Sequence, residues 1–180
     1  GLGDVYKRQL TVNGFDRPLS RHDLENLSEA KDVTGVKVDR VRMIADESLT
    51  RLLDLPALKS VDLSGSQIEQ LPTLSRLTEL KELNLSNTKV QAIEQLRGIE
   101  SLEVVNLEGT QVTSSVTSVL KTLPNLRDLD LSNTLVDEFV LLDLGEMKQL
   151  KRLRIAGLAL PPAAIEKFRK KSPECELVLE

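Results

Sequence analysis

The sequence has no tryptophan and only one histidine, one cysteine, one tyrosine and three phenylalanines among 180 residues. One cysteine cannot form an internal disulfide, and one cysteine with one histidine falls short of the roughly four ligands that a structural zinc site requires. We therefore expect no disulfide and no metal site. Because aromatic residues make up 2 % of the chain, aliphatic side chains must form most of the core.

The sequence also lacks long apolar runs and clustered basic charge. No apolar run approaches the length of about 20 residues needed to cross a bilayer, so we expect no membrane insertion of this segment. Its 24 basic and 28 acidic residues give a net charge of −4, and the basic residues are scattered singly. This pattern provides no patch of positive charge that could bind a nucleic-acid backbone. The absence of a disulfide slightly favours the cytoplasm, but a segment of a secreted protein has the same signature, so the location stays open.

Catalytic motifs are absent as well. The sequence contains no G-x-x-x-x-G-K-[ST] phosphate loop, no H-E-x-x-H and no G-x-S-x-G nucleophile elbow. No nucleophile or orienting acid accompanies His22, for which we expect a solvated or capping role. Cys175 alternates with Leu177 in a strand-like segment and is expected to be a buried thiol. The sequence therefore indicates a protein with no catalytic residues and no cofactor.

Aliphatic residues recur in pairs that are two residues apart, and successive pairs are 22 or 24 residues apart. Each pair is preceded, at three and six residues, by further apolar side chains. Weaker copies extend the series upstream to Leu10 and Val12 and to Val36 and Val38, and downstream to Leu177 and Leu179. The clear pairs are Val61 and Leu63, Leu83 and Leu85, Val105 and Leu107, Leu129 and Leu131, and Leu153 and Ile155.

This pattern resembles the leucine-rich repeat family, whose template L-x-x-L-x-L-x-x-N/C-x-L recurs every 20 to 29 residues. The clearest copy spans residues 80–90, LKELNLSNTKV. The position that usually holds Asn is occupied by Ser66, Thr88, Thr110 and Thr134, which is similar to bacterial members of the family. A hydroxyl at this position can hydrogen-bond the backbone where the chain leaves the strand. Val41 and Leu158 take this position in the outer copies, so we expect the ladder of hydroxyls to end there.

The resemblance implies an α/β fold, a right-handed leucine-rich-repeat solenoid with a parallel concave β-sheet and short helical or irregular convex segments. Alternate residues of an L-x-L strand face opposite sides, so its leucines point inward and each repeat is stacked on the next. Short helices are expected within residues 113–122 and 46–54. A capping-box-like Ser20 and Asp23 predict a helix near the start of the chain. Pro161 and Pro162 predict the first turn of another, which ends before Pro173.

The first nine residues, GLGDVYKRQ, resemble the translation of a transposase-end adapter used in preparing sequencing libraries. We expect residues 1–9 to be an unstructured leader of that origin. Residues 10–180 are predicted to form a single leucine-rich-repeat domain of about seven to eight repeats. On this interpretation the domain is a fragment of a longer protein whose N-terminal part lies upstream of Leu10.

The outward positions of the strands are the candidate binding site. With strands about 4.8 Å apart, the middle outward residues form a row of acid and amide groups roughly 14 Å long. Such a row can accept hydrogen bonds from a partner that presents Lys, Arg or backbone donors. The alternative is a solvated polar face, which we favour for any single residue, whereas we favour binding for the face as a whole. The candidate residues are Asp62, Asn84, Asn106 and Asp130, with Lys37 and Arg154 at the ends and Glu108 and Asp128 beside them.

The resemblance therefore implies a non-catalytic protein–protein interaction module that uses its concave face, with a protein partner of unknown identity. The alternative is a regulatory or substrate-recruiting segment of a larger multidomain enzyme or surface protein. A carbohydrate site usually presents stacking aromatic side chains, and this face has none.

Overall fold

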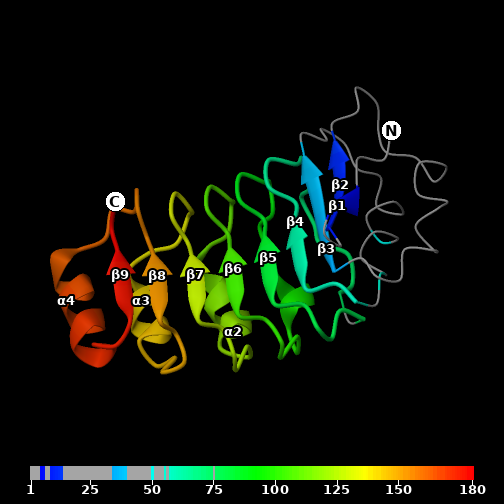
Figure 1. Ribbon diagram of the computed structural model, residues 1–180. Coiled ribbons are helices and arrows are strands. Elements are labelled where there is room, and N and C mark those ends of the chain that lie inside the picture. Colours follow the sequence, from blue (N-terminus) through cyan, green and yellow to red (C-terminus); the bar gives the residue numbers. More distant parts are fainter. Residues whose placement is uncertain are drawn as a thin grey trace.

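The computed structural model describes residues 5–6, 9–13, 34–39, 50, 55, 57–74 and 76–180. One sheet forms one face of the molecule, and helices and turns form the opposite face (Figure 1). The strands are β1 (Val5–Tyr6), β2 (Gln9–Asn13), β3 (Gly35–Asp39), β4 (Ser60–Asp62), β5 (Glu82–Asn84), β6 (Val104–Asn106), β7 (Asp128–Asp130), β8 (Arg152–Arg154) and β9 (Glu176–Val178). The α-helices are α2 (Thr117–Leu120), α3 (Phe139–Leu144) and α4 (Pro162–Lys171), and short 3₁₀ helices cover Glu94–Leu96 and Ser114–Val116.

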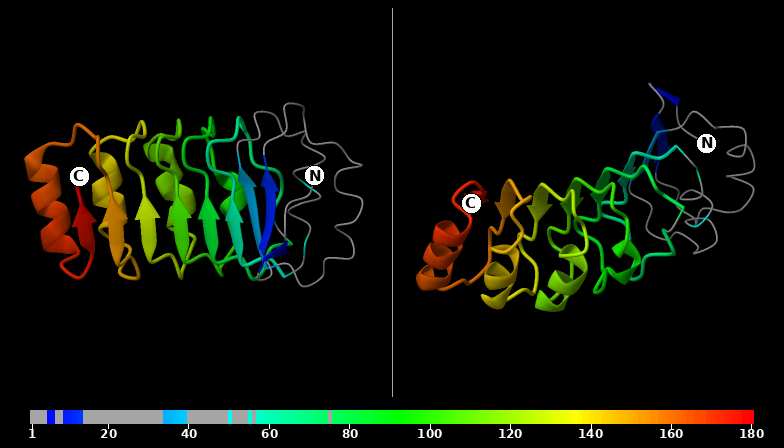
Figure 2. Two further views of the ribbon diagram at one scale, coloured as in Figure 1. Left: turned by 45° about the horizontal axis from the view of Figure 1, so that its top comes forward. Right: turned by 90° about the horizontal axis from the view of Figure 1, so that it is seen from below.

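The described strands follow one another across the sheet in sequence order, from β1 to β9. Strands β2 to β9 are parallel, and the register places Leu83 between Val61 on one side and Val105 on the other. The same register continues through Leu129, Leu153 and Leu177. Each repeat thus contributes one layer of inward aliphatic strand residues, which we call a rung, and the predicted stacking of these rungs is confirmed. Figure 2 shows the resulting row of strands along the solenoid.

Aliphatic side chains fill the space between the sheet and the opposite face. Leu85, Leu107 and Leu131 are fully buried, and the described core contains a single aromatic residue, Phe168 on α4. Each rung lies between the rungs of the neighbouring repeats, so no layer of the middle repeats is exposed to water. The expectation of an aliphatic core is confirmed.

A ladder of hydroxyl groups lies at the end of the strands. Ser66 Oγ donates to the Leu63 carbonyl at 2.6 Å, and Thr110 Oγ1 donates to the Leu107 carbonyl at 2.6 Å. Thr88 and Thr134 make the equivalent bonds. At Leu158 the hydroxyl is missing, and the residues that follow form a separate backbone bond from the Leu160 amide to the Leu158 carbonyl at 2.9 Å. The predicted end of the ladder at Leu158 is confirmed, while Val41 lies outside the described residues.

The convex segments become helical where the repeat is longer. The 22-residue spacing is bridged by the short 3₁₀ helix Glu94–Leu96, whereas the later returns hold α2, α3 and α4. The predicted helix within residues 113–122 and the helix beginning at Pro162 are confirmed. His22 and the helix expected near Ser20 lie outside the described residues, as does the segment 46–54 except for Thr50.

The leader differs from our expectation that residues 1–9 are unstructured. Val5–Tyr6 form β1, which pairs antiparallel with the start of β2 through Val5↔Leu10 and Tyr6↔Gln9. The physical reason is that the outer edge of β2 offers backbone groups that an extended segment can bind. The adapter origin of these residues stays a prediction.

A second ladder, which the sequence analysis missed, is formed by residues with positive φ. Gly65, Asn87, Gly109, Asn133 and Gly157 occupy the same position of successive repeats, with φ between 56° and 72°. Glycine and asparagine are the residues that adopt this left-handed conformation most readily. They alternate for a steric reason, because a Cβ atom at Gly109 would lie 2.7 Å from Asn87 Oδ1 of the preceding repeat, and one at Gly157 would meet Asn133 Oδ1. Each asparagine therefore relies on a glycine in the next repeat.

Replacing Gly109 tests this dependence. We expect Gly109→Ala to lower the free energy of unfolding by about 1–3 kcal/mol, because it combines an unfavourable φ with a clash against Asn87. Gly65→Ala is the matched control, because Gly65 has a similar φ and no atom near the added methyl group. Adding Asn87→Gly should recover part of the loss in Gly109→Ala and none in Gly65→Ala. Denaturant unfolding of these four variants and of Asn87→Gly alone completes two double-mutant cycles and measures this coupling. Equal losses without recovery would contradict it.

Candidate functional site

The outward side chains of the strands form one continuous surface, which we call the strand face. Its middle row runs through consecutive registered positions in β3 to β8. The structure therefore brings the predicted residues of this row together on neighbouring strands. They are Lys37, Asp62, Asn84, Asn106, Asp130 and Arg154.

The acid and amide groups of this row bind their own backbone. Asp62 Oδ1 accepts from the Ser64 amide at 3.0 Å, and Asp130 Oδ1 accepts from the Ser132 amide at 2.9 Å. Asn84 and Asn106 make the same bond to the amide two residues further on. These Asx turns satisfy a backbone donor where the chain leaves each strand. One oxygen of every acid or amide in the row is therefore already occupied, and Asp130 is buried.

The charges at the C-terminal end of the strand face are paired with one another. Arg154 Nη1 lies 2.8 Å from Asp128 Oδ1 and 3.9 Å from Asp130 Oδ2. Arg152 lies 3.6 Å from Asp128 and 2.7 Å from Glu176. The predicted site residues Asp128, Asp130 and Arg154 thus form an ion-pair cluster within the molecule, which leaves them less available to a partner.

Some charges elsewhere on the strand face also form ion pairs. Lys37 lies 3.6 Å from Asp62. Lys81 donates to Glu103 at 2.8 Å, and this hydrogen bond with the lysine charge lowers the pKa of Glu103. Both ion pairs connect adjacent repeats and support their register.

The centre of the strand face is different. Glu82 and Glu108 form no ion pair with any described residue, and Val104, beside Glu82, brings a partly exposed aliphatic side chain to the surface. Because Asn84 and Asn106 use Oδ1 for their own turns, their amide NH₂ groups are available to a partner. This surface, the central patch, therefore combines acidic acceptors, amide donors and an apolar contact. It consists of Glu82, Asn84, Val104, Asn106 and Glu108.

The structure thus changes the expected chemistry of the site. The sequence analysis treated the asparagines as acceptors and gave Val104 no role. The signal that distinguishes the central patch is readable in the sequence, since the registered positions of β7 to β9 alternate between Asp128, Arg152 and Glu176, whereas those beside Glu82 are Ser60 and Val104.

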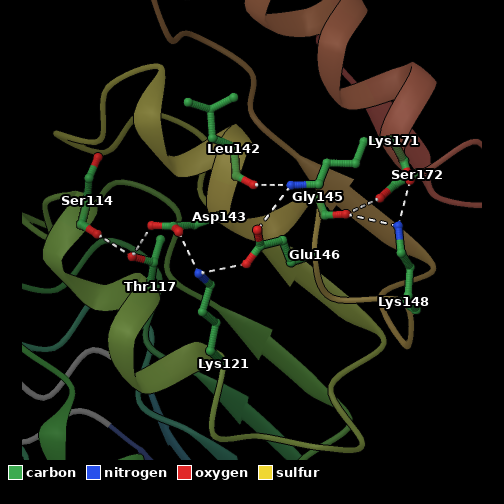
Figure 3. A network of polar contacts seen from close by, with 10 residues as sticks. All are labelled: Ser114, Thr117, Lys121, Leu142, Asp143, Gly145, Glu146, Lys148, Lys171 and Ser172. Atoms are coloured by element: carbon green, nitrogen blue, oxygen red, sulfur yellow. Dashed lines mark hydrogen bonds and ion pairs between the residues drawn. The ribbon is translucent and has the colours of Figure 1, made fainter.

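A second polar cluster connects the convex helices (Figure 3). Lys121 after α2 binds Asp143 of α3 and Glu146, and Lys171 of α4 lies 3.2 Å from Glu146. Thr117 Oγ1 donates to Asp143 at 3.0 Å. The Lys121 hydrogen bond lowers the pKa of Asp143, and hydrogen bonds from Lys171 and Lys121 lower the pKa of Glu146. These ion pairs join side chains from three successive repeats, so the cluster acts as a clamp between them.

The remaining candidate group is Cys175, which is buried, as predicted. Burial raises the pKa of its thiol to about 11, so at neutral pH the thiol is protonated and a poor nucleophile. It lines a small pocket together with Met147, Lys148 and Pro173. Among the described residues, no group of three or more His, Cys, Asp or Glu side chains is placed to hold a metal ion. None of the helices described here has the length and apolar character needed to span a membrane.

A parallel sheet with one aliphatic rung and one hydroxyl cap per repeat defines a leucine-rich-repeat protein. More particularly, residues 55–157 match the family model described as the leucine-rich-repeat domain of the endo-β-N-acetylglucosaminidase EndoS. This match covers more than half of the chain, and the chain belongs to that family. A search of curated protein sequences gave no significant match.

Solved structures support the same fold. Internalin C2 of Listeria monocytogenes superimposes with a TM-score of 0.72 at 22 % identity, over 95 % of this chain and 70 % of that chain. Internalin F of the same organism gives 0.71 at 15 % identity, over 95 % and 46 %. A leucine-rich-repeat protein of Leptospira interrogans gives 0.65 at 24 % identity, over 86 % and 38 %. The chain thus spans less than half of the last two proteins, and at these identities the similarity supports the fold alone.

The role of Asp130 in the fold gives a test of the site. We expect Asp130→Ala to lower the free energy of unfolding by about 1–3 kcal/mol, because the Ser132 amide loses its acceptor. Asp130→Asn should retain most of the stability, since Asn84 and Asn106 already fill the same role with an amide oxygen. Chemical denaturation of both variants measures the difference. Equal losses would show that the charge of Asp130, and not the Asx turn, is what stabilises this strand end.

The clamp formed by the convex helices should contribute to stability in a pH-dependent way. The pKa values of Asp143 and Glu146 are lowered in the folded state, so their contribution to stability is present above the ordinary carboxyl pKa of about 4 and is lost as the pH falls through the lowered values. Lys121→Met should therefore lower the melting temperature near pH 7 and have little effect below about pH 3. Lys167→Met, on the exposed surface of α4, is the control. A pH-independent difference in thermal melts would contradict the clamp.

Proposed function

We propose that the chain is a non-catalytic protein-interaction module and that the central patch of its strand face binds the partner. The observation that carries the proposal is the contrast across this face. The acidic groups Glu82 and Glu108 have no counter-ion among the described residues, whereas Asp62, Asp128 and Asp130 do. The fold family supports a role in protein interaction.

The partner that fits the patch has a definite chemistry. Lys or Arg side chains bind Glu82 and Glu108 through charge-assisted hydrogen bonds. Backbone or side-chain carbonyl groups accept from the amides of Asn84 and Asn106, and an aliphatic side chain covers Val104. The strands hold these groups at fixed spacing, which reduces the entropy cost of binding. Because Trp, Tyr and Arg residues, which dominate binding hot spots, are absent from the patch, the affinity of a single patch is modest.

Selection of binders from a random library tests the patch directly. A peptide display library is panned against the chain, and the enriched peptides are measured against Glu82→Lys/Glu108→Lys. We expect enrichment of Lys and Arg and a loss of binding of at least about tenfold on charge reversal, because close charge pairs change from attractive to repulsive.

The matched control is Glu94→Lys/Glu100→Lys, which reverses two exposed carboxylates outside the strand face. The control should bind like the unmodified chain, and both double variants should melt at similar temperatures. Peptides that bind the Glu82→Lys/Glu108→Lys variant as tightly as the unmodified chain would contradict the proposed surface.

A second candidate function is that of an accessory domain, in which the module recruits substrate for, or regulates, a larger enzyme or surface protein. The observation that favours it is the family match, because the family is described as a domain of an endo-β-N-acetylglucosaminidase. The reading frame upstream of Leu10 in the source genome tests it. A frame that encodes a catalytic domain there, or after Glu180, supports the accessory role, and an open reading frame without a further domain on either side contradicts it.

A further inference from the structure

Three large apolar side chains are exposed in one repeat, on the segment that leads from the turn after β7 into α3. Leu135 is 65 % exposed, Phe139 is 60 % exposed and Leu142 is 44 % exposed. The structure describes the neighbouring repeats on both sides, one with β6 and α2 and the other with β8 and α4. The exposure therefore does not result from an end of the chain.

These side chains lie along one outward-facing line, which we call the apolar patch. Val136 and Val140 of the same segment are buried in the core, and Leu135 and Phe139 each precede one of them. Phe139 and Leu142 are three residues apart in α3, so they lie on the same face of the helix. Leu135 is four residues before Phe139, no more than about 14 Å away. Figure 3 shows the Leu142 side chain pointing away from the ion pairs of the clamp.

The repeat does not require apolar residues at these positions. The Leu135 amide donates to the preceding repeat at 3.0 Å, and the Gln111 amide does the same one repeat earlier, so the two residues are equivalent. In the repeat before the patch, the three positions are polar and hold Gln111, Ser115 and Ser118. In the repeat after it, they hold Ala159, Ala163 and Glu166. The solenoid thus forms without large apolar side chains there, and neighbouring exposed apolar side chains mark interaction sites.

The charge within this segment is acidic. Residues 135–142 read LVDEFVLL, so Asp137 and Glu138 are its charged residues. Asp137 Oδ1 accepts from the Ser114 hydroxyl at 2.7 Å and from the Phe139 amide at 3.1 Å, whereas Oδ2 has no partner among the described residues. The Glu138 carboxylate forms no hydrogen bond or ion pair with any described residue. The two lysines of the clamp are already paired with carboxylates of their own.

These acidic groups argue against a second copy of the chain and against a membrane as the occupant. In a two-fold contact the same surface of both copies meets itself, so Asp137 and Glu138 of one copy would face their equivalents without a cation. Three side chains also provide much less than the about 800 Å² per partner that a stable interface buries. The anionic surface of a membrane would repel both carboxylates.

We propose that the apolar patch binds an amphipathic segment of a partner polypeptide, which carries apolar side chains together with Lys or Arg. The apolar side chains cover Leu135, Phe139 and Leu142, and the Phe139 ring contributes a large contact area when it is buried. The basic side chains pair with Glu138 and with Oδ2 of Asp137 through charge-assisted hydrogen bonds. The apolar patch shares no residue with the central patch, and its test does not depend on the function proposed for that patch.

Differential selection of peptides tests this surface. A random peptide library on phage is first depleted on the variant Leu135→Gln/Phe139→Ser/Leu142→Ser, which carries the residues of the preceding repeat, and is then panned against the unmodified chain. We expect the selected peptides to combine apolar residues with Lys or Arg and to bind the triple variant at least about tenfold more weakly. Both proteins should melt at similar temperatures, because the replaced side chains are exposed. Equal binding to both proteins, selection of peptides without basic residues, or no enrichment would overturn the proposal.

A second variant isolates the charge. Asp137→Asn/Glu138→Gln removes both charges and keeps an oxygen for the Phe139 amide. It should bind the selected peptides about threefold to tenfold more weakly than the unmodified chain, and added salt should reduce the difference. The matched control is Glu82→Gln/Glu108→Gln, which removes two charges from the central patch and should leave this binding unchanged. An equal loss in the control would show that net charge attracts the peptides, and it would overturn the proposal.

The other occupants predict different results. Analytical ultracentrifugation that shows self-association of the unmodified chain but not of the triple variant would overturn the proposal in favour of a second copy. Binding to vesicles of phosphatidylcholine and phosphatidylserine, lost in the triple variant, would overturn it in favour of a membrane. A chain extended at both ends by the flanking residues of its reading frame should bind the selected peptides as tightly as the chain itself. Loss of that binding would show that the protein covers its own patch, and it would overturn the proposal.

Discussion

The fold depends on the burial of each aliphatic rung between the rungs of its neighbours. A single repeat exposes most of its leucines, and burial becomes complete only for repeats that have a neighbour on both sides. Leu83, Val105 and Leu129 illustrate this, since each lies between two strands and is almost inaccessible to water. The hydroxyl ladder, the Asx turns and the ladder of Gly and Asn residues follow the same period. Each new rung adds one strand end, and each strand end needs the same capping groups.

This constraint explains why a recurring polar residue is weak evidence for binding. The Asp and Asn residues of the middle row recur because each strand end requires an acceptor for one backbone amide, as Asp62 and Asn106 show. The threonines recur because the next turn requires a donor to a backbone carbonyl. Functional information lies where the repetition is broken. At Val104 an aliphatic residue reaches the surface, and Glu82 and Glu108 have no cation opposite them among the described residues.

Much of the fold could be predicted from the sequence, because aliphatic spacing determines which residues are buried and in which register they are stacked. The hydroxyl ladder and its end at Leu158 were predictable for a similar reason. A Ser or Thr at this position has one partner close by, the backbone carbonyl three residues earlier, and Leu158 has no hydroxyl. The Gly and Asn ladder was equally readable from Gly65 to Gly157 but depends on φ, which the apolar pattern does not reveal.

The ion pairs were not predictable, because the reach of Arg154 and Lys121 to several carboxylates depends on side-chain conformation and on how the helices pack. The Asx turns were missed for another reason. An outward position was taken to mean that the side chain faces solvent with all its polar atoms free. A short Asp or Asn side chain next to a turn bonds its own backbone first, because that partner is closest and requires no long-range order.

The outer strands of the described sheet are held in different ways at its two ends. At the N-terminal end, β1 pairs antiparallel with β2, so backbone groups at the start of β2 have partners. At the other end, β9 pairs with β8, and α4 contributes Phe168 to the core. The helix buries side chains, whereas β1 supplies backbone bonds to a strand edge. The ion pairs from Arg152 to Asp128 and Glu176 connect β7, β8 and β9 across the sheet, so charge as well as aliphatic packing holds these strands in register.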